Sequence, residues 1–239
     1  MRPRRPTCRL RHRGEMKFVL FDLDDTLTDR HASLERYVDR LRADFAAELG
    51  PIEAARVLAA ILEVDERGYA PRERVFTRLQ TALAWRSVPE LIRLADHWRE
   101  QFPRSTVLRP GALDTLNALR KRGFTLGLVT NGPVGLQQGK IDQVGIERLF
   151  ATIVISEQVG VHKPDPRVFQ RALDQLACAG AEAWFVGDHP RNDVLGAAGV
   201  GMQPIWLTGV HPWPDGIDRP GHRIDRIEDV LRAVMGDID

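Results

Sequence analysis

The sequence has few cysteines and no long apolar stretch. Its 239 residues include two cysteines, Cys8 and Cys178, which are too few for a disulfide framework or a cysteine-ligated metal site. The seven histidines are scattered, and no pair has the helical spacing of zinc ligands. No run of eighteen apolar residues occurs, so we expect neither a membrane-spanning helix nor a membrane partner. These absences favour a cytoplasmic protein without a zinc site.

Positive charge is concentrated at the N-terminus. Residues 1–14 contain six arginines and no acidic residue, whereas the remainder has 28 basic and 33 acidic residues, a net charge of −5. Such an arm could bind nucleic acid or an anionic surface, but it lacks the apolar segment of a secretory signal. A second possible start, Met16, stands directly before the first predicted strand. We therefore expect residues 1–15 to form a disordered basic extension rather than a functional arm.

The rest of the composition is that of a globular protein. Hydrophobic residues make up 43% and charged residues 28%, and the length permits one large or two small domains. The most informative stretch runs from Phe18 to Thr28, where an apolar run predicts a buried strand. Three carboxylates, Asp22, Asp24 and Asp25, follow within four positions. Because clustered carboxylates are costly to bury without a cation, this pattern favours a metal or catalytic site over an acidic turn.

Residues 29–102 show helical periodicity and no strand signal. Apolar residues spaced by three and four from Leu34 to Leu49 predict a first helix, which Gly50–Pro51 ends. A second predicted helix ends near Gly68, and prolines at positions 71 and 89 open two more. We expect these four helices to form an all-helical domain over residues 29–102, inserted after the first strand.

Strands and helices alternate in the remainder of the chain. Strands are predicted at 124–130, 152–156, 184–186 and 204–207, with helices between them and a last helix over 227–235. The alternation predicts a Rossmann-like α/β domain, made of residues 16–28 and 103–239, with a parallel sheet covered by helices on both faces. Ligands of such sheets bind at the carboxyl ends of the strands.

This rule brings distant polar residues to one edge of the sheet. Taken singly, Thr130-Asn131 fits a plain turn, Lys163 a surface lysine and Asp193 a charge at a helix N-terminus. Together they supply four carboxylates, one lysine and one hydroxyl, a set typical of metal-assisted phosphoryl transfer. The residues expected at this edge are Asp22, Asp24, Thr130, Asn131, Lys163, Asp188 and Asp193.

The ordered motifs resemble those of the haloacid dehalogenase-like (HAD) superfamily. Asp22-Leu23-Asp24-Asp25-Thr26 matches its DxDxT signature, and Thr130, Lys163 and the stretch 187–193 resemble its second, third and fourth motifs in the same order. The resemblance covers the chain from about Met16 onward, and the helical insertion looks like the family's C1 cap. Stretches 130–133 and 186–190 are most similar to the branch of pyrimidine 5′-nucleotidases and N-acylneuraminate-9-phosphatase.

The resemblance implies a role for each catalytic residue. Asp22 is expected to be the nucleophile that forms an aspartyl-phosphate, and Asp24 the general acid and base. Lys163 is expected to neutralise negative charge on the nucleophile and the phosphate. The Thr130 hydroxyl and the Asn131 backbone N–H are expected to bind phosphoryl oxygens.

The resemblance also implies Mg²⁺ as the cofactor. Its expected ligands are Asp22, the backbone carbonyl of Asp24 and Asp188, and Asp193 is expected to orient the lysine or a metal-bound water. His189, beside this group, is more consistent with shaping the loop than with binding substrate.

These residues imply a Mg²⁺-dependent phosphatase for small phosphate monoesters, with nucleoside monophosphates or sugar phosphates as substrates. Asp24 favours phosphate chemistry because the dehalogenases of the superfamily attack carbon and do not need this acid. One alternative is a phosphomutase acting on a sugar phosphate. Another is a non-catalytic protein that binds nucleic acid through its basic arm, which the complete motif set disfavours. The sequence predicts neither the exact substrate nor the oligomeric state.

Overall fold

Six parallel strands form the centre of the molecule. In the computed structural model, which describes residues 17–236, the strands lie in the order β3-β2-β1-β4-β5-β6, and every neighbouring pair is parallel. The predicted Rossmann-like α/β fold is confirmed. The strands are β1 (Phe18–Phe21), β2 (Thr125–Thr130), β3 (Thr152–Ile155), β4 (Ala183–Gly187), β5 (Gln203–Leu207) and β6 (His222–Ile224).

Strand β1 lies where the direction of strand order reverses. The chain proceeds from β1 to β2 and β3 on one side, then crosses to β4, β5 and β6 on the other. Phe21, the last residue of β1, therefore pairs with Leu128 of β2 and Val186 of β4. Such a switch point opens a crevice beyond the carboxyl ends of the strands.

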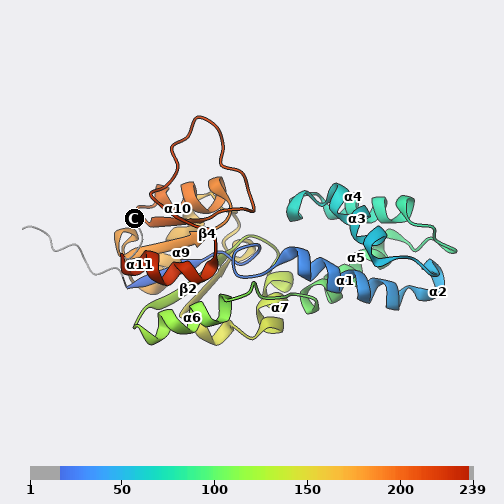
Figure 1. The fold of residues 1–239 in the computed structure, drawn as a ribbon, viewed down its shortest axis with the longest axis horizontal. Coiled ribbons are helices and arrows are strands. Elements are labelled where there is room, and N and C mark those ends of the chain that lie inside the picture. The colour runs from blue at the N-terminus through green and yellow to red at the C-terminus, as the bar shows by residue number, and fades with distance from the viewer. Residues whose placement is uncertain (1–16, 237–239) are drawn as a thin grey trace, which may run out of the picture.

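Successive residues of β1 pack against opposite faces of the sheet. Val19 and Phe21 belong to a core cluster shared with α6, α7 and α11, whereas Leu20 packs with α9 and α10. Helices thus cover both faces, as in Figure 1. Their bounds are α6 (Ala112–Lys121), α7 (Val134–Val144), α8 (Ser156–Val159), α9 (Pro166–Leu176), α10 (Gly196–Gly199) and α11 (Val230–Met235), with the short turns η2 (Glu147–Leu149), η3 (Gly180–Glu182) and η5 (Ile227–Asp229).

A helical bundle lies to one side of the sheet (Figure 1). Its apolar residues form a separate core cluster running from Leu34 to Phe102. Asp29 caps the first helix by accepting a hydrogen bond from the Ala32 backbone N–H at 2.9 Å. An antiparallel bridge between Thr28 and Leu108 joins the two connections to the sheet. The bundle consists of α1 (Arg30–Asp44), α2 (Ala46–Leu49), α3 (Ala54–Asp65), the turn η1 (Glu66–Gly68), α4 (Arg72–Ala82) and α5 (Leu91–Arg104).

Some predicted elements differ from the structure. The first predicted helix is divided at Phe45, whose backbone leaves the helical region while its ring is buried beside Trp85 and His97. The predicted cap boundary at residue 102 falls inside α5. Strand β6 was not predicted, because three residues at a sheet edge give too short an alternation to recognise. The predicted extension, residues 1–15, lies outside the described residues.

The helices give no sign of a membrane span. Within residues 17–236, none is both long enough and apolar enough to cross a bilayer.

Candidate active site

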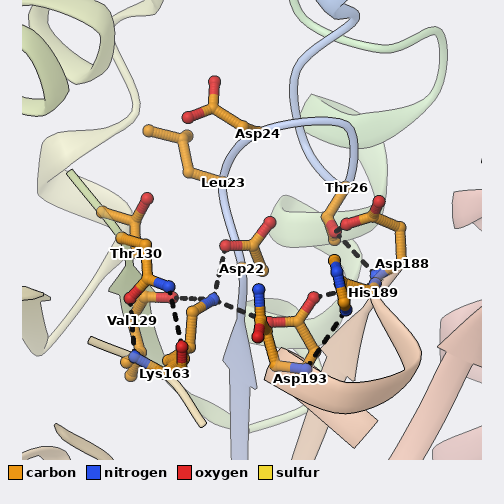
Figure 2. Close-up of polar contacts among 12 residues, drawn as sticks. Asp22, Leu23, Asp24, Thr26, Val129, Thr130, Lys163, Asp188, His189 and Asp193 are labelled. Carbon is orange, nitrogen blue, oxygen red and sulfur yellow. Dashed lines mark hydrogen bonds and ion pairs between the residues drawn. The ribbon is translucent and has the colours of Figure 1, made fainter. Parts of the chain in front are cut away.

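A buried lysine connects two carboxylates at the carboxyl end of β1. The Lys163 ammonium donates hydrogen bonds to Asp22 Oδ1 at 2.6 Å, to Asp193 Oδ1 at 2.7 Å and to the Val129 carbonyl at 2.9 Å (Figure 2). Its side chain is 2% exposed. Burial disfavours the charged lysine, but the two carboxylates outweigh that cost and raise the pKa of Lys163. Lys163 is therefore a fixed positive charge against Asp22.

Asp188 follows β4 and is held by a residue of the opening motif. The Thr26 hydroxyl donates to Asp188 Oδ1 at 3.0 Å and accepts from the Asp188 backbone N–H at 3.1 Å. These two bonds explain the threonine of the DxDxT stretch, to which the sequence analysis assigned no role. His211 Nε2, from the segment between β5 and β6, lies 3.4 Å from Asp188 Oδ2. Burial, His189 and Arg67 lower the pKa of His211 to about 4, so its ring is neutral at pH 7.

Asp22, Asp188 and Asp193 form a group that fits a divalent metal ion. One carboxylate oxygen from each lies within 4.8 Å of the other two, and all three residues are buried. Lys163 offsets only one of the three negative charges. Burial raises the pKa of Asp22 to about 7 despite Lys163, and burial with the neighbouring carboxylates raises that of Asp188 well above its usual value. Hard oxygen donors with excess negative charge suit Mg²⁺.

Asp193 also holds the loop after β4. Its Oδ2 accepts a hydrogen bond from the His189 backbone N–H at 2.9 Å, while its Oδ1 accepts from Lys163. A Cβ on Gly187 would lie 2.4 Å from the Asp193 Cβ, so only glycine permits this approach. His189 accepts from the backbone N–H groups of Arg191 and Asn192, both at 3.2 Å, and so caps the π-helix η4 (Pro190–Leu195). These contacts show His189 shaping the loop.

Thr130 and Asn131 follow β2 beside the same group. Thr130 is 1% exposed and its hydroxyl accepts a hydrogen bond from Gln137. The Asn131 side chain bonds both backbone groups of Lys163: its Oδ1 accepts from the N–H at 2.8 Å and its Nδ2 donates to the carbonyl at 3.1 Å. Asn131 thus fixes the segment that presents the lysine, a contact that the sequence analysis did not foresee.

Comparison with known proteins decides the family. The model of the haloacid dehalogenase-like hydrolases, a family of the hydrolase class, matches residues 16–201. The chain belongs to this family. The predicted family resemblance is therefore confirmed.

The relatives of this HAD-like hydrolase are mostly named as phosphatases. Phosphoserine phosphatase of Thermus thermophilus is 33% identical, and the match covers 91% of this chain and 99% of that protein. Pyrimidine 5′-nucleotidase YjjG of Escherichia coli is 38% identical over 110 residues, 45% of this chain and 48% of that protein. Other relatives are named glyceraldehyde 3-phosphate and phosphoglycolate phosphatases. The predicted enzyme class, a phosphoric monoester hydrolase, is confirmed.

A solved structure of similar fold is a 2-haloacid dehalogenase of Pseudomonas syringae pv. tomato. It has a TM-score of 0.62 and 30% identity, and the match covers 92% of this chain and 99% of that one. The fold alone therefore does not separate attack on carbon from attack on phosphorus.

The Asp24 side chain turns away from Asp22 (Figure 2). Its carboxylate instead contacts two residues that were not predicted from the sequence. Lys140 Nζ lies 2.8 Å from both carboxylate oxygens of Asp24, and Gln137 Nε2 donates to Oδ2 at 2.9 Å. Burial raises the pKa of Asp24, but Lys140 outweighs this and leaves it below its usual value. Asp24 could therefore reach a metal only through its backbone carbonyl. The available signal was two polar residues, three apart, on the inward face of α7.

A cavity of about 690 Å³ lies above these residues. Asp22, Lys163 and Asp188 line it from the sheet, and the segment between α3 and α4, residues 67–71, lines it from the helical bundle. Tyr69 of this segment accepts a hydrogen bond from Asn192 Nδ2 at 3.0 Å, which connects the bundle to the loop after β4. The site is thus enclosed by both parts of the fold, which suits a small substrate.

Proposed function

We propose that this HAD-like hydrolase is a Mg²⁺-dependent phosphatase that hydrolyses small phosphate monoesters through an aspartyl-phosphate. One observation carries the proposal: Asp22 stands at the end of β1, 2.6 Å from a buried lysine and within a group of three buried carboxylates. This arrangement supplies a nucleophile, a fixed positive charge and oxygen donors for a cation. The phosphatase names of the relatives support the same chemistry.

Asp22 begins the reaction in the proposed mechanism. Its free carboxylate oxygen attacks phosphorus, and the bond between phosphorus and the ester oxygen breaks as the aspartyl-phosphate forms. Lys163 and the Thr130 hydroxyl stand where they can stabilise charge on the phosphoryl oxygens. Water then attacks the same phosphorus, releases inorganic phosphate and restores the Asp22 carboxylate.

Asp24 moves the protons in this mechanism. It donates one to the leaving oxygen and takes one from the attacking water, so that it returns to its starting state. In the described conformation its carboxylate lines the cavity and accepts hydrogen bonds from Lys140 and Gln137, which hold it in a defined orientation. An alkoxide leaving group needs this proton, whereas displacement of halide from carbon does not. Asp24 therefore favours phosphatase over dehalogenase activity.

Asp22, Asp188 and the Asp24 carbonyl would hold the ion, with Asp193 orienting Lys163 or a water. When bound, Mg²⁺ supplies the positive charge that offsets repulsion between the nucleophile and the phosphate. The excess of two negative charges over Lys163 is the structural reason to expect a dication here.

The domain division supports a capped site. We propose that residues 29–102 form the cap and that residues 16–28 and 103–239 form the core. The separate apolar cluster of the bundle and the paired connections at Thr28 and Leu108 support this division. A cytoplasmic location remains a prediction from the low cysteine content.

Replacement of the nucleophile tests the proposed function. We expect Asp22→Asn to abolish release of phosphate from p-nitrophenyl phosphate in the presence of Mg²⁺, because the amide oxygen is a poor nucleophile. The exposed Asp114→Asn on α6 serves as the control and should retain wild-type turnover. Circular dichroism should show that both variants are folded. Near-normal turnover by Asp22→Asn would contradict the assignment.

A further inference from the structure

The positive side chains around the cavity are paired with carboxylates, with one exception. Lys163 pairs with Asp22 and Asp193, and Lys140 pairs with Asp24. Arg30 and Arg72 both pair with the buried carboxylate of one residue, Asp65, at 2.7 Å. The fifth cation, Arg67, has neither a hydrogen bond nor an ion pair within residues 17–236, although it lines the cavity.

The backbone around Arg67 has an uncommon conformation. Glu66, Arg67 and Gly68 have φ angles of 48°, 54° and 93°, so two consecutive residues other than glycine lie in the left-handed region. Such residues are uncommon and are concentrated at ligand sites. The bidentate pairing of Asp65 with Arg30, and its second pairing with Arg72, anchor both ends of this turn. These ion pairs hold the backbone on both sides of Arg67 in place.

The surroundings of Arg67 are polar. Tyr69 packs edge-on against His211, with ring centroids 6.1 Å apart, and its hydroxyl contacts Asn192. Arg67 and His211 line the same cavity, one from the helical bundle and the other from the segment between β5 and β6. Arg67, Tyr69, Asn192 and His211 therefore form one group, the cap subsite, which shares the cavity with Asp22 and Lys163.

Two aromatic residues of the cavity, Trp98 and Phe102, do not offer a place to stack a nucleobase. Trp98 and Phe102 are stacked on each other at 4.1 Å with an interplanar angle of 10°, and each is 3% exposed. Arg72 covers the Trp98 ring and Arg30 the Phe102 ring, each guanidinium carbon 5.3 Å from the centroid. These two rings therefore give the cavity no stacking surface, and the Tyr69 ring, which is 55% exposed, packs edge-on against His189 and His211.

We propose that the cap subsite binds a second anionic group of the substrate, so that the preferred substrates are small phosphate monoesters that also carry a carboxylate or a second phosphate. This inference rests on the proposed phosphatase function. Lys163 and the metal donors serve the phosphate that reacts, which leaves Arg67 for another anion. A guanidinium suits this role because its planar donors match carboxylate and phosphate oxygens in pairs.

Matched substrate pairs test the inference. O-Phosphoserine and O-phosphoethanolamine differ in one carboxylate, and fructose 1,6-bisphosphate and fructose 6-phosphate differ in one phosphate. If the subsite binds a carboxylate, we expect the wild-type enzyme to prefer O-phosphoserine to O-phosphoethanolamine. If it binds a phosphate, we expect it to prefer fructose 1,6-bisphosphate to fructose 6-phosphate. We expect Arg67→Gln to lower the ratio of kcat/KM between the two members by roughly 10- to 100-fold, mainly through KM. Arg67→Lys should restore part of the ratio. The two pairs distinguish a carboxylate ligand from a phosphate ligand.

The control is Arg78→Gln, a half-buried cap arginine that pairs with Glu63 outside this cavity, which should leave both ratios unchanged. A thermal melt should show that Arg67→Gln and Arg67→Lys fold like the wild type. If phosphate esters are hydrolysed but neither ratio depends on Arg67, the inference is wrong and the proposed function stands. If p-nitrophenyl phosphate and all four esters resist hydrolysis with Mg²⁺, the proposed function itself fails, and the inference fails with it.

Discussion

At the scale of single residues, Lys140 determines how Asp24, the proposed acid, is oriented. Lys140 is buried, with a side chain 7% exposed, and it lies 5.4 Å from the Phe102 ring centroid while contacting both oxygens of Asp24. A buried ammonium is costly unless it is paired, so this contact holds Asp24 in a defined orientation. Gln137 links the same carboxylate to Thr130. Helix α7 therefore positions both Asp24, the proposed acid, and Thr130, which is expected to bind the phosphoryl group.

Lys140→Met should impair proton transfer more than phosphoryl binding. Without Lys140 the Asp24 carboxyl loses its orientation, and misplacement of a general acid costs about 10- to 100-fold. We expect kcat/KM for an alkyl phosphate to fall by this factor and that for p-nitrophenyl phosphate to fall much less, because nitrophenolate leaves without protonation. Steady-state kinetics on both esters measure the difference.

The matched control is Lys121→Met, an exposed lysine of α6 that should leave both rates unchanged. Lys140→Arg keeps a positive charge beside Asp24, so it should retain part of the wild-type kcat/KM for the alkyl phosphate. Equal losses on both esters would indicate that Lys140 only supports the fold.

The sequence predicted the charged residues of this site better than their partners. Four charged residues meet at one sheet edge, a consequence of parallel topology: Asp22 and Asp188 follow strands, Lys163 lies in the loop before α9, and Asp193 lies in η4. Lys140 was not predicted to belong to the site, because a lysine in a helix is usually solvated and its packing against Phe102 cannot be read from the sequence. His211 lies in a long connection without periodicity, so no pattern placed it beside Asp188.

At the scale of elements, the turn between α3 and α4 depends on one buried acid. Asp65 is 1% exposed and accepts hydrogen bonds from Arg30 at the start of α1 and Arg72 at the start of α4. It therefore joins three helices at the point where the bundle faces the cavity. Burial raises the pKa of Asp65, but Arg30 and Arg72 outweigh it and leave the pKa below the usual value.

Asp65→Asn should destabilise the protein by about 2–4 kcal/mol at pH 7, because it leaves two partly buried guanidinium groups without their carboxylate. Urea unfolding followed by circular dichroism measures the loss. The exposed Asp96→Asn, which breaks a surface pair with Arg99, should cost less than about 0.5 kcal/mol.

The pH dependence of Asp65→Asn has a definite sign. A carboxyl whose folded pKa is depressed stabilises the fold above its unfolded pKa and loses that contribution as the pH falls through the folded pKa. The difference between wild type and Asp65→Asn should therefore be constant near neutrality and shrink below about pH 4. A difference that grows on acidification would contradict this account of the ion pairs.

Element boundaries show what periodicity can and cannot supply. The parallel strands β1, β2, β3, β4 and β5 were predicted because they are short apolar runs, and all but β1 lie between predicted helices. The division of the first helix at Phe45 was not, because the apolar spacing continues unbroken from Leu34 to Leu49 across it. The cap subsite was also missed, since its turn depends on left-handed backbone at Glu66 and Arg67 that neither residue type favours.

At the scale of the whole molecule, the repulsion among the buried carboxylates of Asp22, Asp188 and Asp193 links folding stability to metal binding. The folded pKa values of Asp22 and Asp188 are raised, Asp22 to about 7. Such groups favour the folded state fully below their unfolded pKa, and this contribution is lost as the pH rises through the folded pKa. Repulsion among these carboxylates therefore destabilises the metal-free protein more at pH 8 than at pH 5.

Mg²⁺ should reduce the repulsion among these carboxylates and thereby stabilise the folded protein more at high pH than at low pH. Because protons compete with the ion for Asp22 and Asp188, we expect the stabilisation by Mg²⁺ to be larger at pH 8 than at pH 5. A concentration one hundred times the dissociation constant adds about 2.7 kcal/mol, which corresponds to a rise in Tm of roughly 5–10 °C for a chain of this size. Differential scanning calorimetry with Mg²⁺ and with EDTA measures the rise at each pH. Asp188→Asn should abolish most of it, whereas the exposed Asp114→Asn should keep it. Equal shifts at both pH values, or a full shift in Asp188→Asn, would show that the ion binds elsewhere.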